Sequence, residues 1–386
     1  MTGEIRVKEN PLGPWLPLLE EYELSTVPGE LILRGRLRHG MGPASPEVEA
    51  ALGDWSGTAH LHGDEAGVEL VLVLPEDEDE GRPWLHAVLL GCTILTTLAA
   101  GALMEGMDPF HTRVARLGGV LVPYPTGIDL ATLRLGIPFA LPFLGVLLAH
   151  EMGHYAAARR HRIRASLPYF IPFPPYFSII GTMGAFIRLR GATIRRTQLF
   201  DVGASGPVVS FVLSLPLLAW GLSLSSSVSG PASLASPFVV EFAGQAVWLG
   251  NGPLVHLMAV AFGPEGLGRD PVLLHPVAFA GWLGLFVTAL NLLPLGQLDG
   301  GHVLYALFGD VQARTARLFL LALLPLGLLW WGWWAWAALI WVLHRGRLRH
   351  PSVIQPQVRL RRRRRLLGWA LIVIFFLTFV PVPLGI

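Results

Sequence analysis

This 386-residue sequence has few charged residues: Asp, Glu, Lys and Arg make up 15% of it, whereas globular chains carry about 25%. Long runs of Leu, Ala, Val, Phe and Trp take their place, and the hydrophobic share is 52%. This composition excludes a disordered protein and argues against a soluble enzyme. Cysteine is almost absent as well. Because Cys92 stands alone, an internal disulfide and a cysteine-only metal cage are both excluded.

The charged residues that do occur divide the chain into two regions. Residues 1–82 have mixed charge and short alternating patterns, whereas residues 83–386 are apolar. In the first region, Glu30–Arg38 alternates like a strand, and Pro46–Leu52 has helical spacing behind a cap at Ser45. Thr58–His62 and Val68–Leu74 are expected to form a two-stranded hairpin, and residues 75–80 an acidic tether. We therefore expect a small α+β module. Its acidic, serine-poor start argues against a signal or transit peptide.

The second region contains apolar runs long enough for membrane spans, which need about 20 residues each. The expected spans are 84–103, 135–158, 202–222, 276–293, 317–343 and 366–382. The run at 317–343 is interrupted by proline and glycine and has arginines on both sides, which favours a hairpin hinged near Gly332 over one straight crossing. The sequence thus predicts a polytopic α-helical membrane protein of about six to seven helices.

The placement of arginine predicts the orientation of these spans. Positive residues in short loops mark the cytoplasmic side, and arginines follow the second span at 159–164 and precede the third at 188–196. The loop between these spans is therefore expected in the cytoplasm, and the N-terminal module with it. By the same reasoning the fourth span ends on the cytoplasmic side, which places Asp299 level with His150 and His154.

The second expected span carries His150-Glu151-Met152-Gly153-His154, an H-E-x-x-H motif. Residues four apart share one helix face, so both imidazoles reach one metal ion while Glu151 projects beside the bound water. Zinc accepts histidine nitrogens and lowers the pKa of bound water to about 7. Glu151 can take that water's proton as it attacks a carbonyl and pass it to the leaving amine. Ionisable groups in an apolar span are costly and indicate function; the alternative is interfacial polar residues where the helix leaves the membrane.

A third zinc ligand is expected because catalytic zinc usually has three protein ligands and one open position. The candidate is Asp299: Pro294 breaks the apolar helix before it, and Gly300 and Gly301 let the chain turn past its carboxylate. The alternative is that Asp299 caps the next helix. Asn291 has apolar neighbours and is expected to donate a hydrogen bond to the developing oxyanion, or else to pack helices through its amide.

Two of these segments, HEMGH and NLLPLGQLDGG, resemble the signatures of the site-2 protease family of intramembrane zinc metalloproteases. Four further segments resemble one branch of this family, which includes plant chloroplast members and bacterial homologues. They are residues 167–175, 181–188 and 201–207, and LILRGRLR near the N-terminus. The resemblance implies a site-2-protease-like transmembrane core behind a small soluble domain. It also implies roles for five residues: His150, His154 and Asp299 as zinc ligands, Glu151 as catalytic base and Asn291 as a transition-state aid. An obvious PDZ insertion, which many bacterial relatives have, is missing.

The loop between the second and third spans contains Gly181–Leu189, which is β-prone and interrupted by glycines. A protease must hold its target extended, and an edge strand at the mouth of the site would pair with an unwound substrate segment. The family resemblance implies the same role. The expected substrate-binding residues are Gly181, Gly184, Ala185 and Phe186. The alternative is a strand that only holds the loop on the membrane surface.

The basic run Arg361–Arg365 would indicate nucleic-acid binding in a soluble protein. Directly before an apolar span it is typical of an anchor to anionic lipid on the cytoplasmic side. The tryptophans between residues 330 and 336 are expected to form an interfacial belt. The expected partners are therefore the lipid bilayer and an integral membrane protein substrate, and no nucleic acid.

These observations predict an intramembrane endopeptidase with one catalytic Zn²⁺ that hydrolyses a peptide bond within or near a transmembrane segment. We expect a multi-pass protein of a bacterial cytoplasmic membrane with its N-terminus in the cytoplasm. Two alternatives stay open. One is a proteolytically inactive scaffold or chaperone, against which the intact Glu151 and ligand set argue. The other is a divalent-metal transporter, against which the absence of an internal sequence repeat argues.

Overall fold

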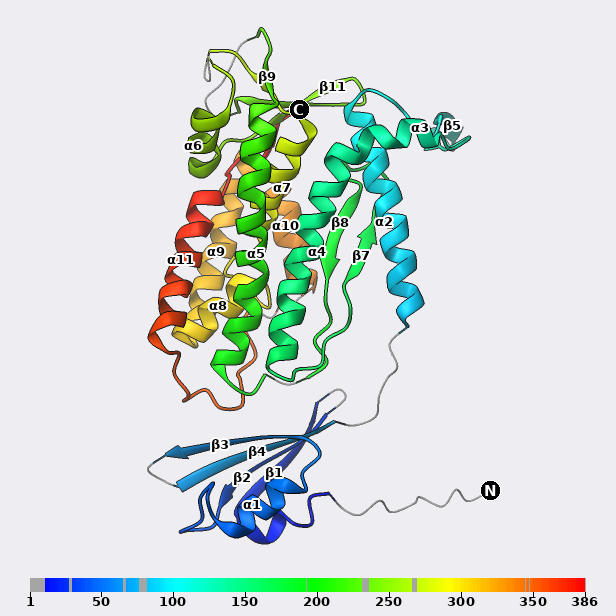
Figure 1. Cartoon of the computed structure of the whole chain (residues 1–386). Coiled ribbons are helices and arrows are strands. Elements are labelled where there is room, and N and C mark those ends of the chain that lie inside the picture. The colour runs from blue at the N-terminus through cyan, green and yellow to red at the C-terminus, as the bar shows by residue number, and fades with distance from the viewer. Residues whose placement is uncertain are drawn as a thin grey trace, which may run out of the picture. The chain divides into compact units, whose positions relative to one another are not determined.

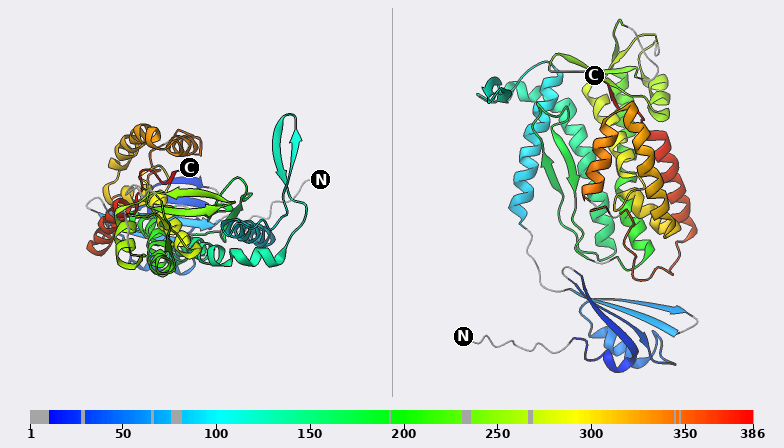
Figure 2. Two further views of the ribbon diagram at one scale, coloured as in Figure 1. Left: turned by 90° about the horizontal axis from the view of Figure 1, so that it is seen from above. Right: turned by 180° about the vertical axis from the view of Figure 1, so that it is seen from behind.

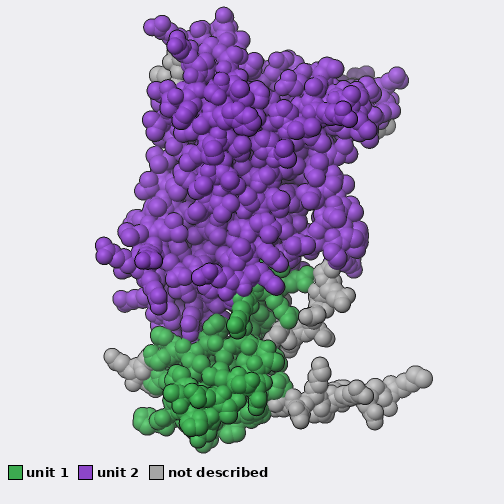
Figure 3. Space-filling model, in the orientation of Figure 1, with its two compact units in different colours: residues 1–81, 162–165, 189–192 green, residues 82–161, 166–188, 193–386 purple. Residues whose placement is uncertain are grey.

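The computed structural model describes residues 11–385 apart from 28–29, 65–66, 76–81, 192, 231–235, 266–268, 344 and 347. The chain divides into two compact units, coloured separately in Figure 3. Unit 1 comprises Met1–Gly81 together with Arg162–Ala165 and Leu189–Ala192, and unit 2 comprises the remainder. Each unit has a hydrophobic core of its own.

Unit 1 contains a four-stranded antiparallel sheet in the order β1-β2-β4-β3. Its elements are β1 (Leu19–Val27), β2 (Glu30–Leu37), α1 (Pro46–Gly53), β3 (Thr58–Asp64) and β4 (Gly67–Pro75). Buried leucines of β2 and β4, among them Leu33 and Leu70, pack against Trp15 and α1. The acidic tether expected at 75–80 lies outside the described residues except for its first position.

The structure adds one strand to the expected α+β pattern and changes one detail. Strand β1 was not predicted: its residues 20–26 are exposed, and three of them are glutamates, a residue that is depleted in strands. Ser45 occupies the N-cap position of α1, but its side chain makes no capping bond to the helix. The Ser45 hydroxyl instead accepts a hydrogen bond from the Gly42 amide at 2.9 Å.

Unit 2 is built from helices (Figure 1). Their bounds are α2 (Pro83–Met104), α3 (Leu130–Leu133), α4 (Ile137–Arg160), α5 (Arg196–Ser223), α6 (Pro253–Phe262), α7 (Pro276–Asn291), α8 (Asp299–Phe308), α9 (Val311–Leu329), α10 (Gly332–Leu343) and α11 (Arg362–Thr378). Four helical segments among the described residues are long and apolar enough to cross a membrane: Pro83–Met104, Leu130–Arg160, Arg196–Ser223 and Val311–Leu329. The expected spans at 276–293 and 366–382 correspond to the shorter helices α7 and α11, of 16 and 17 residues.

Helix α5 is central to unit 2, with α4 and α7 packed against it. Glycines allow this close approach, as is common between membrane helices. A Cβ added to Gly221 of α5 would lie 2.1 Å from the Ala278 nitrogen of α7, and one added to Gly281 would lie 2.5 Å from the Leu218 nitrogen. The three helices therefore hold the residues along their contacts in fixed positions.

A β-hairpin lies between α2 and α4 (Figure 1). It consists of β7 (Tyr169–Pro172) and β8 (Thr182–Phe186), which pair antiparallel. Strand β7 contacts α2, and β8 contacts α4. The expected strand at 181–189 is thus present over its first half.

Tyr176, in the turn of this hairpin, ties it to the loop after α2. Its hydroxyl donates to Asp108 Oδ1 at 2.6 Å, and the amides of Phe110 and Thr112 donate to the same carboxylate at 3.0 and 2.6 Å. Partial burial raises the pKa of Asp108, but these hydrogen bonds outweigh it and hold the pKa below its usual value. The charged carboxylate therefore anchors the hairpin tip.

Short strands form two further sheets in unit 2, which hydrophobic periodicity did not predict. The five-stranded sheet has the order β13-β11-β10-β12-β9, with β9 (Ser226–Ser227), β10 (Phe238–Phe242), β11 (Gln245–Leu249), β12 (Val272–Leu273) and β13 (Leu384–Gly385). A ribbon of β5 (Arg113–Leu117) and β6 (Val120–Tyr124) projects from the bundle (Figure 2). Strands of two to five residues are too short to show a period.

The apolar run expected at 317–343 is a helical hairpin, α9 and α10, broken at Trp330–Trp331. Its first arm starts at Val311 and is 19 residues long, which is long enough to cross a membrane by itself. The ends of the two arms meet: Gln312 Nε2 donates to the Leu348 carbonyl at 3.2 Å, and Arg349 binds Asp310 at 2.9 Å. Both flanks of the hairpin therefore lie together.

The tryptophans of this hairpin do not form the uniform interfacial belt that the sequence suggested. Trp333 is fully buried, and its indole N–H donates to the Pro381 carbonyl at 2.7 Å. Trp331 and Trp334 are exposed. The expectation was wrong for Trp333 because the α9–α10 turn directs one indole into the core that these helices form with α11.

Candidate metal centre

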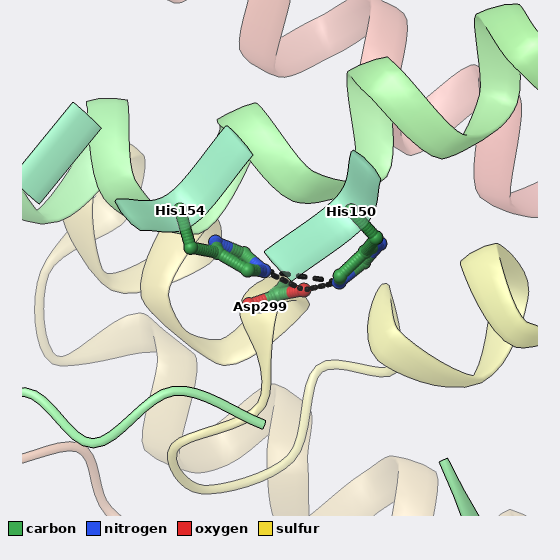
Figure 4. Close-up of side chains that lie close together, drawn as sticks. All are labelled: His150, His154 and Asp299. Carbon is green, nitrogen blue, oxygen red and sulfur yellow. Dashed lines mark hydrogen bonds and ion pairs between the residues drawn. The ribbon is translucent and has the colours of Figure 1, made fainter. Parts of the chain in front are cut away.

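Helix α4 carries His150, Glu151 and His154, all of which are buried. The two histidines lie one turn apart on the same face, and their rings are directed toward Asp299 (Figure 4). His150 Nε2 and His154 Nε2 are 3.0 Å apart. Each lies 3.3 Å from Asp299 Oδ2. The structure therefore brings together the three residues that the sequence proposed as ligands, with their donor atoms within 4.8 Å of one another.

Asp299 is the first residue of α8, and the preceding residue, Leu298, occupies the N-cap position. The alternative interpretation of Asp299 as the helix cap is therefore wrong. The two glycines that follow allow a close turn. A Cβ on Gly300 would lie 2.0 Å from the Leu292 carbonyl oxygen, and one on Gly301 would lie 2.3 Å from the Gly296 oxygen. Only glycine fits here, and the turn aims the carboxylate at α4.

Partners on the far ring nitrogens orient both imidazoles. His154 Nδ1 lies 2.7 Å from the Val202 carbonyl, so Nδ1 carries the proton and Nε2 is free to bind metal. His150 Nδ1 lies 3.1 Å from Ser210 Oγ, which in turn lies 2.8 Å from Thr288 Oγ1. These supporting residues were not predicted from the sequence. Ser210 and Thr288 are hydroxyls within apolar helices, which is a weak signal, whereas Val202 contributes only its backbone.

Gly206 of α5 allows both Nε2 atoms to lie close to the α5 backbone. A Cβ at this position would lie 2.2 Å from His154 Nε2 and 2.8 Å from His150 Nε2. Any larger residue here would therefore displace the two imidazoles. Two imidazole nitrogens and one carboxylate oxygen this close together fit a zinc ion with an open position.

We expect Gly206→Ala to lower zinc affinity by at least about tenfold, because its methyl group would displace the Nε2 atoms and disturbing even outer-shell partners costs about 10- to 100-fold. The measurement is zinc content of the purified chain under chelator competition. Gly145→Ala is the matched control, since a Cβ at that α4 position meets nothing within 4 Å. Equal zinc affinity in both variants would contradict a role for Gly206 in placing the two imidazoles.

Asn291 and Glu151 complete the site. Asn291 ends α7, and its side-chain nitrogen lies 3.2 Å from His150 Nε2. The Glu151 carboxylate accepts a hydrogen bond from the Ile187 amide, directly after β8. The hairpin is thereby joined to the candidate base.

The four residues expected to bind substrate lie on or beside β8. Gly181 precedes the strand with a φ of 70°. A Cβ there would lie 2.3 Å from the Thr96 carbonyl of α2, so Gly181 packs on that helix rather than at the metal centre. Gly184, Ala185 and Phe186 lie within β8.

A pair of histidines one helical turn apart, a carboxylate from another helix and an adjacent glutamate define the site of a zinc metallopeptidase. The family follows from comparison with known proteins. Residues 138–324 match the model of Peptidase family M50. Over these residues, just under half of the chain, the match agrees with the resemblance of the motifs to the site-2 proteases.

Curated relatives agree with this assignment. The chain is 33% identical over 193 residues to rice "Probable zinc metalloprotease EGY1, chloroplastic" (50% of this chain, 32% of the relative). It is 31% identical over 236 residues to the Arabidopsis thaliana protein of the same name (58% and 40%). It is 25% identical over 325 residues to Arabidopsis "Probable zinc metallopeptidase EGY3, chloroplastic" (77% and 51%). No solved structure matches the chain significantly.

Each match covers only part of the relative. The chain spans between about a third and a half of the length of the relatives it matches. Their names place them in chloroplasts and so lend no support to the bacterial cytoplasmic membrane that we expected. These relatives are named probable zinc metalloproteases, which agrees with the donor set that this chain brings together.

Proposed function

We propose that this chain is an intramembrane zinc endopeptidase that cleaves a peptide bond within or near a transmembrane segment. The observation that carries the proposal is the convergence of His150 Nε2, His154 Nε2 and Asp299 Oδ2 beside the buried Glu151. Two of these donors come from α4, which is long and apolar enough to cross a membrane. A hydrolytic centre on such a helix suits a substrate that is itself in the membrane.

In this proposal His150, His154 and Asp299 would hold one zinc ion, which when bound would supply Lewis-acid polarisation of the scissile carbonyl and activation of water. Glu151 accepts the proton of the attacking water and delivers it to the leaving amine. The Asn291 amide, beside His150, donates a hydrogen bond to the oxygen on which negative charge develops. The hydroxyl of Ser210 and the carbonyl of Val202 keep the imidazoles in position.

We further propose that β8 holds the substrate. A peptide bond within a helix has its carbonyl hydrogen-bonded along the helix, so the target must be extended before cleavage. Among the described residues β8 pairs only with β7, and its other side lies toward α4 (Figure 1). A substrate strand added at that edge would run beside the helix that carries Glu151.

A photo-cross-linking amino acid at Phe186 should therefore capture a bound membrane substrate. Phe186 is exposed and lies one residue before Ile187, whose amide contacts Glu151. The matched control is the same amino acid at Phe177, which is also exposed but lies in the turn of the hairpin. We expect several-fold more adduct at Phe186, measured by mass spectrometry. Equal capture at both positions would contradict presentation by β8.

The orientation is proposed from charge. The C-terminal end of α4 and the N-terminal ends of α5 and α11 are rich in arginine, which favours the cytoplasm for this end of the bundle. This would place the N-terminal unit in the cytoplasm and the metal centre near the cytoplasmic face.

The test of the activity is metal removal. We expect a chelator to abolish cleavage of a model transmembrane substrate by the purified chain in detergent, and added Zn²⁺ to restore it. An inactive scaffold would cleave nothing in either state. A metal transporter would carry Zn²⁺ into proteoliposomes without cleaving the substrate, and that result would contradict the proposal.

A further inference from the structure

A basic cavity lies at the end of unit 2 where α5 and α11 begin. Its volume is about 420 Å³, and six residues line it: Arg196, Ala306, Leu307, Arg359, Leu360 and Arg365. Half of them are arginines and none is acidic. The cavity is separate from the metal centre, because none of its lining residues is a candidate ligand.

Asp201, an acidic residue on α5, is paired with an arginine that does not line the cavity. Asp201, in the second turn of α5, is bound by Arg364 through two hydrogen bonds of 2.7 Å. It also lies 2.8 Å from His161 Nε2. Arg364 is thus paired, whereas Arg359 and Arg365 on either side of it in sequence have no carboxylate partner within the described part of the chain.

Arg196 adds a second indication that an anion belongs here. Its Nε is buried and has no hydrogen-bond partner among the described residues, and its guanidinium lies 5.9 Å from the centre of the Tyr305 ring. A buried donor without an acceptor is destabilising, and an anion in the cavity would supply the missing acceptor.

The helices around the cavity contribute further positive potential. Arg196 is the first residue of α5, and Arg365 lies in the first turn of α11. Helix N-termini carry partial positive charge and exposed N–H groups, which favour phosphate. The N-cap residue of α11, Arg361, makes no side-chain capping bond. The starts of two helices and three arginines therefore contribute positive potential at the cavity.

We propose that this cavity binds the phosphate of an anionic membrane phospholipid. Ala306, Leu307 and Leu360 give it one apolar side, which suits a phosphate that carries acyl chains better than a free ion. Its position at the arginine-rich end of the candidate spans is the level at which lipid headgroups lie. A phospholipid bound in this cavity would contact both α5, which carries Gly206, and α8, which begins with Asp299.

The test uses the full chain in neutral detergent with phosphatidylglycerol, phosphatidylcholine or inorganic phosphate. We expect native mass spectrometry to show one phosphatidylglycerol retained per chain, and thermal unfolding to shift upward with this lipid and not with phosphatidylcholine. Arg359→Gln/Arg365→Gln should weaken phosphatidylglycerol binding by about tenfold or more, since each arginine contributes appreciably at an anionic surface. Both side chains are exposed, so the variant should fold.

The matched control is Arg361→Gln/Arg363→Gln, which removes the same charge from exposed residues that do not line the cavity. Loss of binding in the first variant but not in the control supports the site. Equal loss in both would show diffuse attraction and overturn it, and so would unchanged binding in both. If inorganic phosphate displaces the lipid and stabilises the wild type alone, the site is a phosphate site whose ligand is the soluble ion. Arg196→Lys, which keeps the charge but removes Nε, is expected to weaken binding as well.

Discussion

Replacing Glu151 with glutamine is expected to reduce cleavage by about 10²–10⁴-fold, the usual contribution of a general base. Glutamine keeps the shape of the side chain and can still meet the Ile187 amide through its carbonyl oxygen, but it cannot accept a proton from water. Zinc content should not change, since Glu151 is not among the three converging donors. The measurement pairs a turnover assay on a model transmembrane substrate with metal analysis of the same preparation.

Glu105→Gln is a suitable control, because it makes the same chemical change at an exposed residue directly after α2. Its cleavage rate should equal that of the wild type. Full cleavage by Glu151→Gln with zinc bound would rule out the glutamate as base and leave the metal centre without its proposed mechanism.

Asp299→Ala is expected to have the second large effect, on the metal itself. The change removes one of three donors, and altering outer-shell partners alone lowers metal affinity by about 10- to 100-fold. We therefore expect zinc affinity to fall by more than about 100-fold, and cleavage to fall with it. Chelator competition measures the affinity. Circular dichroism of the same sample checks that the helices remain.

The matched control for this variant is Asp270→Ala, at an exposed aspartate remote in sequence from both α4 and α8. It should bind zinc as the wild type does. If Asp299→Ala kept wild-type zinc affinity, the third donor would have to be another residue, and the convergence seen in Figure 4 would be structural only.

The candidate ligands were predictable from sequence because their geometry is local or signalled by chain breaks. The i, i+4 spacing of His150 and His154 fixes them on one face wherever a helix forms. Asp299 follows a proline break and precedes two glycines, and both mark a sharp turn. The supporting atoms were not predictable. Val202 acts through a backbone carbonyl that every residue has, and the Thr288 hydroxyl also bonds to its own helix at Gly284, like an ordinary span threonine.

The fold was predictable where hydrophobic runs are long. The expected spans at 84–103 and 135–158 agree with α2 and α4 to within a few residues. Prediction failed where tertiary contacts decide the structure. The first turns of α9 contain Arg314 and Arg317 and so appear too polar for a span. Several of the five short strands pair with partners far away in sequence, such as Trp248 with Gly385, which no local pattern reveals.

The division of the donor set between α4 and α8 has a consequence for the timing of biosynthesis. Translation delivers the histidines of α4 first, and α5, α6 and α7 must follow before Asp299 emerges. A nascent chain therefore holds only two of the three proposed ligands until α8 packs against α5. On the proposed function, hydrolytic competence is acquired only after α8 has been made, so a chain shorter than this cannot cut the proteins being inserted beside it.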